Sequence, residues 1–108
     1  MTESEFNQNV DDILTQIEDA IDESGADIDY DSVGGVLTLT FEDDSKIIIN
    51  RQTPLKQIWL ATRSGGFHFE YNADKNQWLL ENDSQELFDA LTQYSSVQAG
   101  NSVELKAN

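Results

Sequence analysis

The sequence contains no cysteine, one proline and one histidine. Without cysteine, the chain itself cannot form disulfides, use a catalytic thiolate or hold a cysteine-ligated zinc ion or iron–sulfur cluster. A lone histidine without a placed nucleophile is a poor catalytic candidate, so we interpret His68 as a surface residue of a sheet.

Basic residues are also scarce, with 6 Lys and Arg against 21 Asp and Glu and a net charge of −15. None of the six bases lies within residues 1–45, where two thirds of the acids are found. Nucleic acid is excluded as a partner, because phosphate contacts require Lys and Arg. The asymmetry indicates cations or a basic protein surface as partners, and acidity that serves only solubility is the alternative.

Long hydrophobic runs are absent, and no apolar stretch approaches the roughly 20 residues of a membrane span. Residues 1–9 are acidic and polar, unlike a secretory signal or a mitochondrial transit peptide. We therefore expect no membrane association and a cytoplasmic, reducing location. The length of 108 residues predicts a single domain over residues 1–108.

Apolar residues recur at helical spacing near the start of the chain. The residues on this stripe are Phe6, Val10, Ile13, Leu14, Ile17 and Ile21. This spacing predicts one amphipathic helix over residues 4–24, starting at Ser4-Glu5 and ending at Gly25.

Short alternating segments rich in β-formers follow. The expected strands cover residues 27–31, 36–41, 46–50, 57–62, 67–71 and 77–80. Asp83 to Glu86 resembles a capping box, so a second helix is expected from there to about Val97, and residues 101–108 show no clear pattern. The order predicts an α+β fold, a two-layer α/β sandwich with both helices on one face of an antiparallel sheet of about six strands.

Acids dominate the polar side of the first predicted helix. They are Asp11, Asp12, Glu18, Asp19, Asp22 and Glu23. Like charges four residues apart, such as Glu18 and Asp22, repel by a few tenths of a kcal/mol, and no base on this helix compensates them. Carboxylates suit hard cations such as Ca²⁺, Mg²⁺, Mn²⁺ and iron, which predicts an exposed, weak and poorly selective site. A charged solubilising face is the alternative.

Three further acids, Asp27, Asp29 and Asp31, are expected to share one face of the first strand and to extend the helical acids into a contiguous ridge. They do not open an EF-hand loop. That pattern requires Gly at its sixth position and Glu at its twelfth, where this chain has Ser32 and Thr38.

One aromatic residue is expected on the outer face of the sheet. If Ile58 and Leu60 face the core, Trp59 must face solvent together with Gln57. An outward Trp is often a binding anchor, although a partly covered structural ring is an equal alternative. The end of the preceding strand, Asn50-Arg51-Gln52, is expected to share this surface.

Four segments of the chain are long and specific in sequence: Gly34-Gly35-Val36-Leu37-Thr38-Leu39-Thr40-Phe41, Ile47-Ile48-Ile49-Asn50-Arg51-Gln52-Thr53-Pro54, Gln57-Ile58-Trp59-Leu60-Ala61-Thr62 and Gly65-Gly66-Phe67-His68-Phe69. They resemble the frataxin family, in particular its bacterial members, so the expected cytoplasm is that of a bacterium. The resemblance covers nearly the whole chain and implies a frataxin-like fold.

The resemblance also implies weak surface binding of iron, Fe²⁺ and Fe³⁺, with other divalent cations able to substitute. The implied ligands are Glu18, Asp19, Asp22, Glu23, Asp27, Asp29 and Asp31, which we call the acidic ridge. The implied partners are the cysteine desulfurase and the scaffold protein of iron–sulfur cluster assembly. The implied partner-binding residues of the sheet are Asn50, Gln57 and Trp59.

Three functional hypotheses follow. The first is an iron-binding adaptor that regulates cluster assembly without turnover of its own, monomeric unless excess iron drives oligomerisation. The second is an acidic docking module for which metal binding is incidental. The third, a ferroxidase, is disfavoured because di-iron sites use inward-pointing carboxylates with histidine, and here the acids are expected to point outward. We therefore expect no enzymatic activity.

Overall fold

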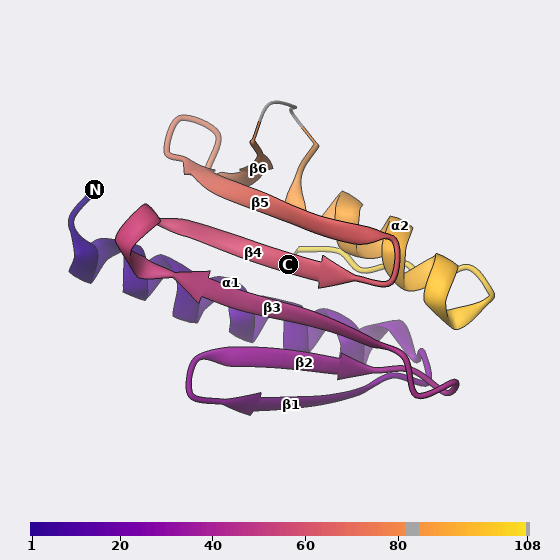
Figure 1. Cartoon of the computed structure of the whole chain (residues 1–108). Helices are drawn as coiled ribbons and strands as arrows, with labels where there is room; N and C mark the ends of the chain where they lie inside the picture. Colours follow the sequence, from indigo (N-terminus) through magenta and orange to yellow (C-terminus); the bar gives the residue numbers. More distant parts are fainter. Residues whose placement is uncertain (82–84, 108) are drawn as a thin grey trace.

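The computed structural model describes residues 1–81 and 85–107. Its elements are, in order, α1 (Glu3–Ser24), β1 (Asp29–Val33), β2 (Val36–Thr40), β3 (Lys46–Gln52), η1 (Thr53–Leu55), β4 (Gln57–Thr62), β5 (Gly65–Asn72), β6 (Gln77–Leu80) and α2 (Leu87–Ala99). The six strands form one antiparallel sheet in the order β1 to β6, and both helices lie on one of its faces (Figure 1). The predicted two-layer α/β sandwich is confirmed.

Helix α1 begins one residue earlier than predicted, because Thr2 and not Ser4 caps it. The Thr2 hydroxyl accepts from the backbone N–H of Glu5, and the Glu5 carboxylate accepts from the backbone N–H of Thr2. This capping box satisfies two of the N–H groups that a helix start leaves unpaired. The Thr2 hydrogen bonds also lower the pKa of Glu5. Gly25 ends the helix in the left-handed region, as predicted.

The sheet is a meander whose tight turns fix the register of each strand pair. Directly paired residues of antiparallel strands share a face, so one row of the sheet consists of Val36, Asn50, Trp59 and His68. This row lies on the face turned away from the helices, the outer face. The neighbouring positions point inward and carry the apolar side chains of the core.

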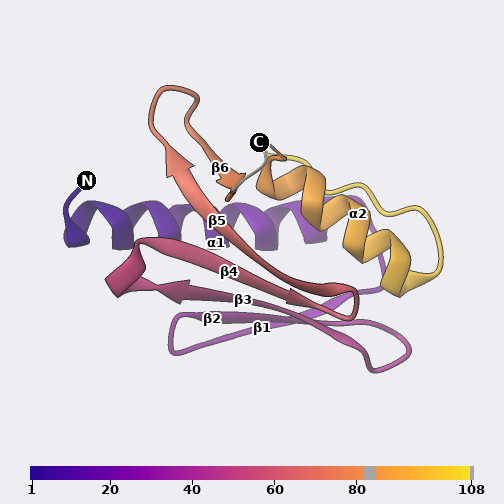
Figure 2. The same ribbon diagram turned by 45° about the horizontal axis from the view of Figure 1, so that its top comes forward.

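The core lies between the sheet and the two helices (Figure 2). Its fully buried large side chains are Trp78, Phe6, Phe69, Ile17, Leu37, Leu39, Ile47, Ile49, Ile58, Leu60, Leu87 and Leu91. Phe6 of α1 meets Trp78 of β6 edge-on with ring centroids 5.9 Å apart, and Trp78 is a buried core residue. Burial of each such side chain contributes about 1.5–3 kcal/mol.

Helix α2 is capped by Glu86, whose carboxylate accepts from the backbone N–H groups of Phe88 and Asp89. Burial raises the pKa of Glu86, although these hydrogen bonds act in the opposite direction. The capping box predicted at Asp83-Ser84-Gln85-Glu86 falls partly outside the described residues. The helix runs two residues past the predicted end, to Ala99, and Gly100 follows it in the left-handed region.

The segment after α2 is more ordered than its sequence indicated. Val103 and Leu105 are buried core residues, because an extended chain turns alternate side chains toward α2. The hydroxyls of Thr92 and Ser96 exchange hydrogen bonds with the backbones of Leu105 and Val103 respectively. Residues 101–107 form no helix or strand, in line with the lack of a sequence pattern, but hydroxyl groups one helix turn apart hold Val103 and Leu105 against α2.

No helix within residues 1–81 and 85–107 is long and apolar enough to cross a membrane. Helix α1 is long, but its exposed side is acidic.

Candidate cation-binding ridge and docking face

The acids at the C-terminal end of α1 gather around one tyrosine of β1. The Tyr30 hydroxyl donates to both carboxylate oxygens of Asp22, at 3.0 and 2.9 Å. This hydrogen bond, followed by desolvation and the negative charges of Asp22, Glu18 and Asp19, raises the pKa of Tyr30. Tyr30 therefore lies within the combined negative field of three ridge carboxylates.

Asp27 does not share a strand face with Asp29 and Asp31, contrary to the expectation from sequence. Asp27 lies in the bend before β1, which begins at Asp29. Its carboxylate meets Glu42 of the β2–β3 turn, and the hydrogen bond and charge of Asp27 raise the pKa of Glu42. Both residues line an open cavity of about 520 Å³ between the ends of α1 and α2.

Asp29 and Asp31 lie on the outer face of the edge strand β1, where they pair with Thr40 and Thr38. Tyr30, between them, points to the helix side. The acidic ridge therefore occupies three places: the exposed end of α1, the bend with Asp27, and the outer face of β1. The ridge wraps around the edge of the sheet and does not form one flat face.

Arg51 of β3 neutralises one acid, Asp11, in the N-terminal half of α1. Arg51 contacts Asp11 with Nη2 to Oδ1 at 2.5 Å and also donates from Nη1 to Oδ1 of Asn7 at 3.2 Å. Arg51 points to the helix side of the sheet, because it pairs with the buried Ile58. The expectation that Arg51 shares the outer surface with Asn50 was wrong, since neighbouring strand residues face opposite ways.

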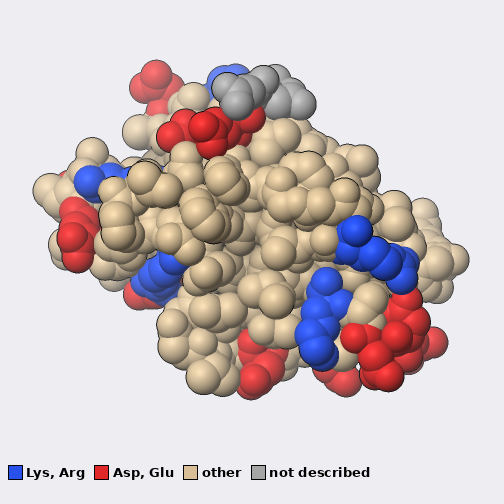
Figure 3. All heavy atoms as spheres, viewed as in Figure 1, with Lys and Arg blue, Asp and Glu red and all other residues tan. Residues whose placement is uncertain are grey.

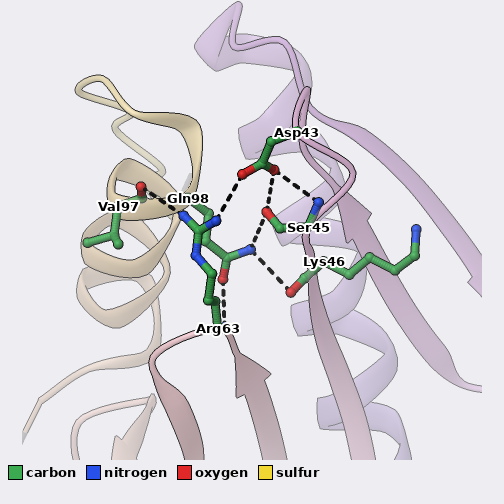
Figure 4. Close-up of polar contacts among 6 residues, drawn as sticks. All are labelled: Asp43, Ser45, Lys46, Arg63, Val97 and Gln98. Atoms are coloured by element: carbon green, nitrogen blue, oxygen red, sulfur yellow. Dashed lines mark hydrogen bonds and ion pairs between the residues drawn. The ribbon is translucent and has the colours of Figure 1, made fainter.

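A second arginine, Arg63, is engaged at the opposite end of the sheet (Figure 4). Its guanidinium donates from Nη1 to Oδ2 of Asp43 at 2.9 Å and from Nη2 to the carbonyl of Val97 at 3.4 Å. The buried Gln98 accepts from the backbone N–H of Arg63 and donates to Ser45 and Lys46. These contacts tie the β2–β3 turn, the β4–β5 turn and the end of α2 together.

The acidic ridge receives none of this neutralisation. Among residues 1–81 and 85–107, the acids that pair with Lys or Arg are Asp11, Asp43 and Glu104, and none belongs to the ridge. Across the same residues, no three Asp, Glu or His side chains are grouped closely enough to hold one metal ion together. A cation on the ridge would bind one or two carboxylates and keep most of its water ligands, as Mg²⁺ commonly does.

The outer face of the sheet carries the predicted docking residues. Trp59 and Asn50 pair directly across β3 and β4, and Gln57 lies two residues before Trp59 on the same face. The middle of this face shows mainly uncharged atoms, with acidic and basic atoms toward its margins (Figure 3). Trp59 is half-buried, and Gln57 is only 8% exposed. The predicted outward orientation of Trp59 is confirmed.

Sequence reasoning assigned no role to two residues that the fold places beside the predicted ones. Glu42 meets Asp27 across 15 positions of the chain, and no sequence signal announces that contact. His68 stacks on Trp59 with centroids 4.3 Å apart and planes at 9°. That pairing was accessible from sequence, because a two-residue turn at Arg63-Ser64 sets Trp59 opposite His68.

An antiparallel six-stranded sheet, two helices on one face and an acidic edge define the class of frataxin-like α+β domains. Residues 1–101 match the family model described as a frataxin-like domain. The chain belongs to the frataxin family.

Relatives and solved structures agree over nearly the full length. Proteins named "Iron-sulfur cluster assembly protein CyaY" from Vibrio vulnificus and Photobacterium profundum are 51% and 47% identical to this chain over 104 residues. Those alignments cover 96% of this chain and 98% and 97% of the relatives. Frataxin from Psychromonas ingrahamii superposes with a TM-score of 0.89 at 42% identity, covering 98% and 99% of the two chains. Trimeric frataxin from Saccharomyces cerevisiae gives 0.70 at 29% identity, covering 86% and 80%.

Proposed function

We propose that this protein acts in iron–sulfur cluster assembly as an iron-binding adaptor. It binds Fe²⁺ and Fe³⁺ weakly on the acidic ridge and docks on the complex of cysteine desulfurase and scaffold protein. The observation that carries this proposal is that none of the seven ridge carboxylates pairs with a Lys or Arg within the described residues, although Asp11, Asp43 and Glu104 do. The names of its bacterial relatives support a role in iron–sulfur cluster assembly.

The physical reason is unrelieved repulsion. Glu18 and Asp22 are one helix turn apart, as are Asp19 and Glu23, and all four lie in the last two turns of α1. The helix dipole also disfavours anions at the C-terminal end of a helix. The repulsion among the four carboxylates and the effect of the dipole therefore both destabilise this end of α1. Only an external cation or a basic protein surface can relieve the repulsion. Oxygen ligands and exposure favour a hard cation held weakly.

The outer sheet face supplies the second contact of the proposed docking. Asn50 and Trp59 lie next to each other on an uncharged part of the surface, and buried aromatic anchors dominate the energy of many interfaces. In this arrangement the ridge meets a basic patch of the desulfurase, while the face around Trp59 contacts the partner complex. Long-range charge would accelerate the encounter, and the aromatic contact would determine its lifetime.

A titration with Fe²⁺ tests the metal part. Under anaerobic conditions, amide NMR signals of residues 18–31 should broaden first, and the unfolding midpoint should rise by mass action. The triple variant Asp19→Asn, Asp22→Asn, Glu23→Gln should lose both effects. A matched control, Glu3→Gln, Asp74→Asn, Asp89→Asn, removes the same charge elsewhere and should retain them. Equal responses from the two triple variants would exclude the ridge as the iron site.

A purely electrostatic docking module is the second candidate. It is favoured by the finding that no three potential ligands are grouped for one metal ion across the described residues. Charge reversal at Asp19, Asp22 and Glu23 to Lys should then abolish desulfurase binding equally with and without iron. Binding by the wild-type protein that strictly requires iron would eliminate this version.

We further propose that the protein has no turnover of its own, acts as a monomer and works in the bacterial cytoplasm. The only histidine, His68, lies on the outer sheet face and not among the acids of α1, which disfavours a histidine-containing di-iron site. Iron oxidation in the presence of the protein should proceed at the rate measured in buffer. A rate increase that the ridge triple variant abolishes would instead establish a ferroxidase.

A further inference from the structure

Four side chains on the outer face of the sheet form a closed ring of contacts. Trp59 Nε1 donates to Gln57 Oε1 at 2.9 Å, and Gln57 Nε2 donates to Glu81 Oε2 at 3.2 Å. Glu81 Oε2 lies 3.4 Å from His68 Nδ1, and the imidazole of His68 stacks on the indole of Trp59. The backbone N–H of Glu81 also donates to the carbonyl of His68 at 2.8 Å, so the ring is anchored to the main chain.

Gln57 is enclosed by this ring. It is only 8% exposed, and both ends of its amide are engaged, since Nε2 also reaches Glu70 Oε2 at 3.4 Å. Its amide therefore has little to offer an incoming protein. What Gln57 does is fix the edge of the indole, while the stacked imidazole of His68 fixes one of its faces.

The ring also decides what Trp59 presents to solvent. The indole N–H is already bonded within the protein, so Trp59 is available as an apolar aromatic surface and not as a hydrogen-bond donor. His68 and Glu81 keep 44% and 42% of their side-chain surface exposed beside it. A side chain held in one orientation before binding loses less entropy when the complex forms.

We propose that Gln57, Glu81 and His68 are positioning residues that fix Trp59 for docking, and that Trp59 meets an apolar or aromatic side chain of its protein partner. This inference rests on the proposed docking on the assembly complex. It assigns an indirect role to Gln57, which sequence reasoning placed among the contact residues.

The first experiment combines indole NMR with binding to the purified cysteine desulfurase–scaffold complex. Gln57→Leu nearly keeps the side-chain volume but removes all three side-chain hydrogen bonds of Gln57, so the Trp59 Nε1–H signal should shift and exchange faster with water. Binding should weaken by about two- to tenfold. Gln8→Leu is the matched control, because Gln8 is an exposed residue of α1, away from the outer face of the sheet, and its amide also donates to a carboxylate, that of Asp12. It should change neither readout.

A second pair of variants separates positioning from the loss of charge. Glu81→Gln retains an oxygen that accepts from Gln57 and should leave the Trp59 indole signal in place, whereas Glu81→Leu should shift it as Gln57→Leu does. Trp59→Phe keeps an aromatic ring but loses the N–H that Gln57 holds, so its binding should weaken about as much as that of Gln57→Leu. Trp59→Ala should lose about tenfold or more. Unfolding midpoints are measured for every variant, and binding is compared well below the lowest of them.

The possible failures are distinguishable. An unchanged Trp59 indole signal in Gln57→Leu would show that the ring does not hold the indole in solution. A shifted signal with unchanged binding would show that the orientation is irrelevant to docking, and equal losses from Trp59→Phe and Trp59→Ala would show that the N–H is the recognised group. Absence of binding by the wild-type protein would instead overturn the proposed docking itself.

Discussion

One acid in the N-terminal half of helix α1, Asp11, pairs with an arginine, whereas the four acids at its C-terminal end do not pair with any base that the structure describes. Near its N-terminus, Asp11 and Asn7 bond to Arg51, which reaches them from β3 across 40 or more positions of the chain. Near its C-terminus, Glu18, Asp19, Asp22 and Glu23 have no Lys or Arg partner in the described part of the chain. At this end, the carboxylate of Asp22 accepts hydrogen bonds from the hydroxyl of Tyr30 in β1.

This difference shows that the fold can supply a base to a helical acid, as Arg51 does for Asp11. The guanidinium of Arg51 packs so closely under Gly35 that a Cβ added there would lie 3.0 Å from Nε, and Gly35 has a φ of +80°. Glycine is thus required at this position both for its backbone conformation and for the space that Arg51 occupies. The unpaired end lacks such an arrangement, which is expected where a site is kept available for a ligand.

Breaking the contacts of Arg51 should have the largest effect on stability. Arg51→Met breaks the contacts with Asp11 and Asn7, and we expect a loss of about 1–2 kcal/mol in the free energy of unfolding. For a domain of this size, that corresponds to a fall of several degrees in the unfolding midpoint. Lys75→Met, in the β5–β6 turn, makes the same change in net charge. Calorimetry that gives equal midpoints for both variants would show that the Arg51 contacts contribute nothing beyond overall charge.

Removing charge from the C-terminal end of α1 should instead increase the stability of the protein. The variant Asp19→Asn, Asp22→Asn, Glu23→Gln relieves like-charge pairs and should increase the free energy of unfolding by about 0.3–1 kcal/mol. The same three-charge change in Glu3→Gln, Asp74→Asn, Asp89→Asn should increase it less or not at all. Urea unfolding at low ionic strength measures the difference. A destabilised ridge variant would contradict the idea that the ridge is repulsive.

The contact between Asp43 and Arg63 extends the comparison to acidic pH. Hydrogen bonds from Ser45 and, to a lesser extent, from Arg63 lower the pKa of Asp43 to about 2. A lowered pKa in the folded state means that the contribution of Asp43 is present above its ordinary pKa and is lost as pH falls through about 2. Asp43→Asn should therefore be less stable than the wild type at pH 7, and the two should converge below pH 2. A difference that persists at the lowest pH would rule out the carboxylate as its source.

The smallest effect is expected at Tyr30, and it should appear at the other end of the pH scale. The raised pKa of Tyr30 means that its hydrogen bond to Asp22 stabilises the fold at neutral pH and is lost as pH rises above the ordinary pKa of tyrosine, about 10. Tyr30→Phe should lower the unfolding midpoint by less than Arg51→Met does, and the difference should shrink in alkaline solution. Tyr94→Phe, which removes a phenol far from the ridge, serves as the control and should not reproduce this pH dependence.

Much of the fold was predictable because its signals are local. The 3.6-residue period of α1, the alternation in β2 and the turn residues between strands each involve neighbours in sequence, and the structure places these elements within a few residues of the prediction. One error was local, because Thr2 and not Ser4 caps α1. The order of the segment with Val103 and Leu105 depends instead on a distant group, since this segment packs on α2.

The candidate site divides in the same way. The identity of the acids and the lack of bases in residues 1–45 were visible at once, and so was the outward direction of Trp59. The direction in which Asp27 turns, and its meeting with Glu42, depend on how the bend after α1 approaches the β2–β3 turn. The ring of four side chains that includes Trp59 likewise forms only when β4, β5 and the end of β6 are side by side.

The sequence by itself determined the secondary structure, the sign of the charge and the list of carboxylates, because these follow from residue type and local spacing. Only the tertiary structure decided that Asp11 and Asp43 are neutralised, because Arg51 and Arg63 reach them only after the sheet brings distant segments together. The C-terminal end of α1 is thereby left with its negative charge uncompensated. The pairing of the strands, in turn, encloses Gln57 and leaves part of Trp59 exposed.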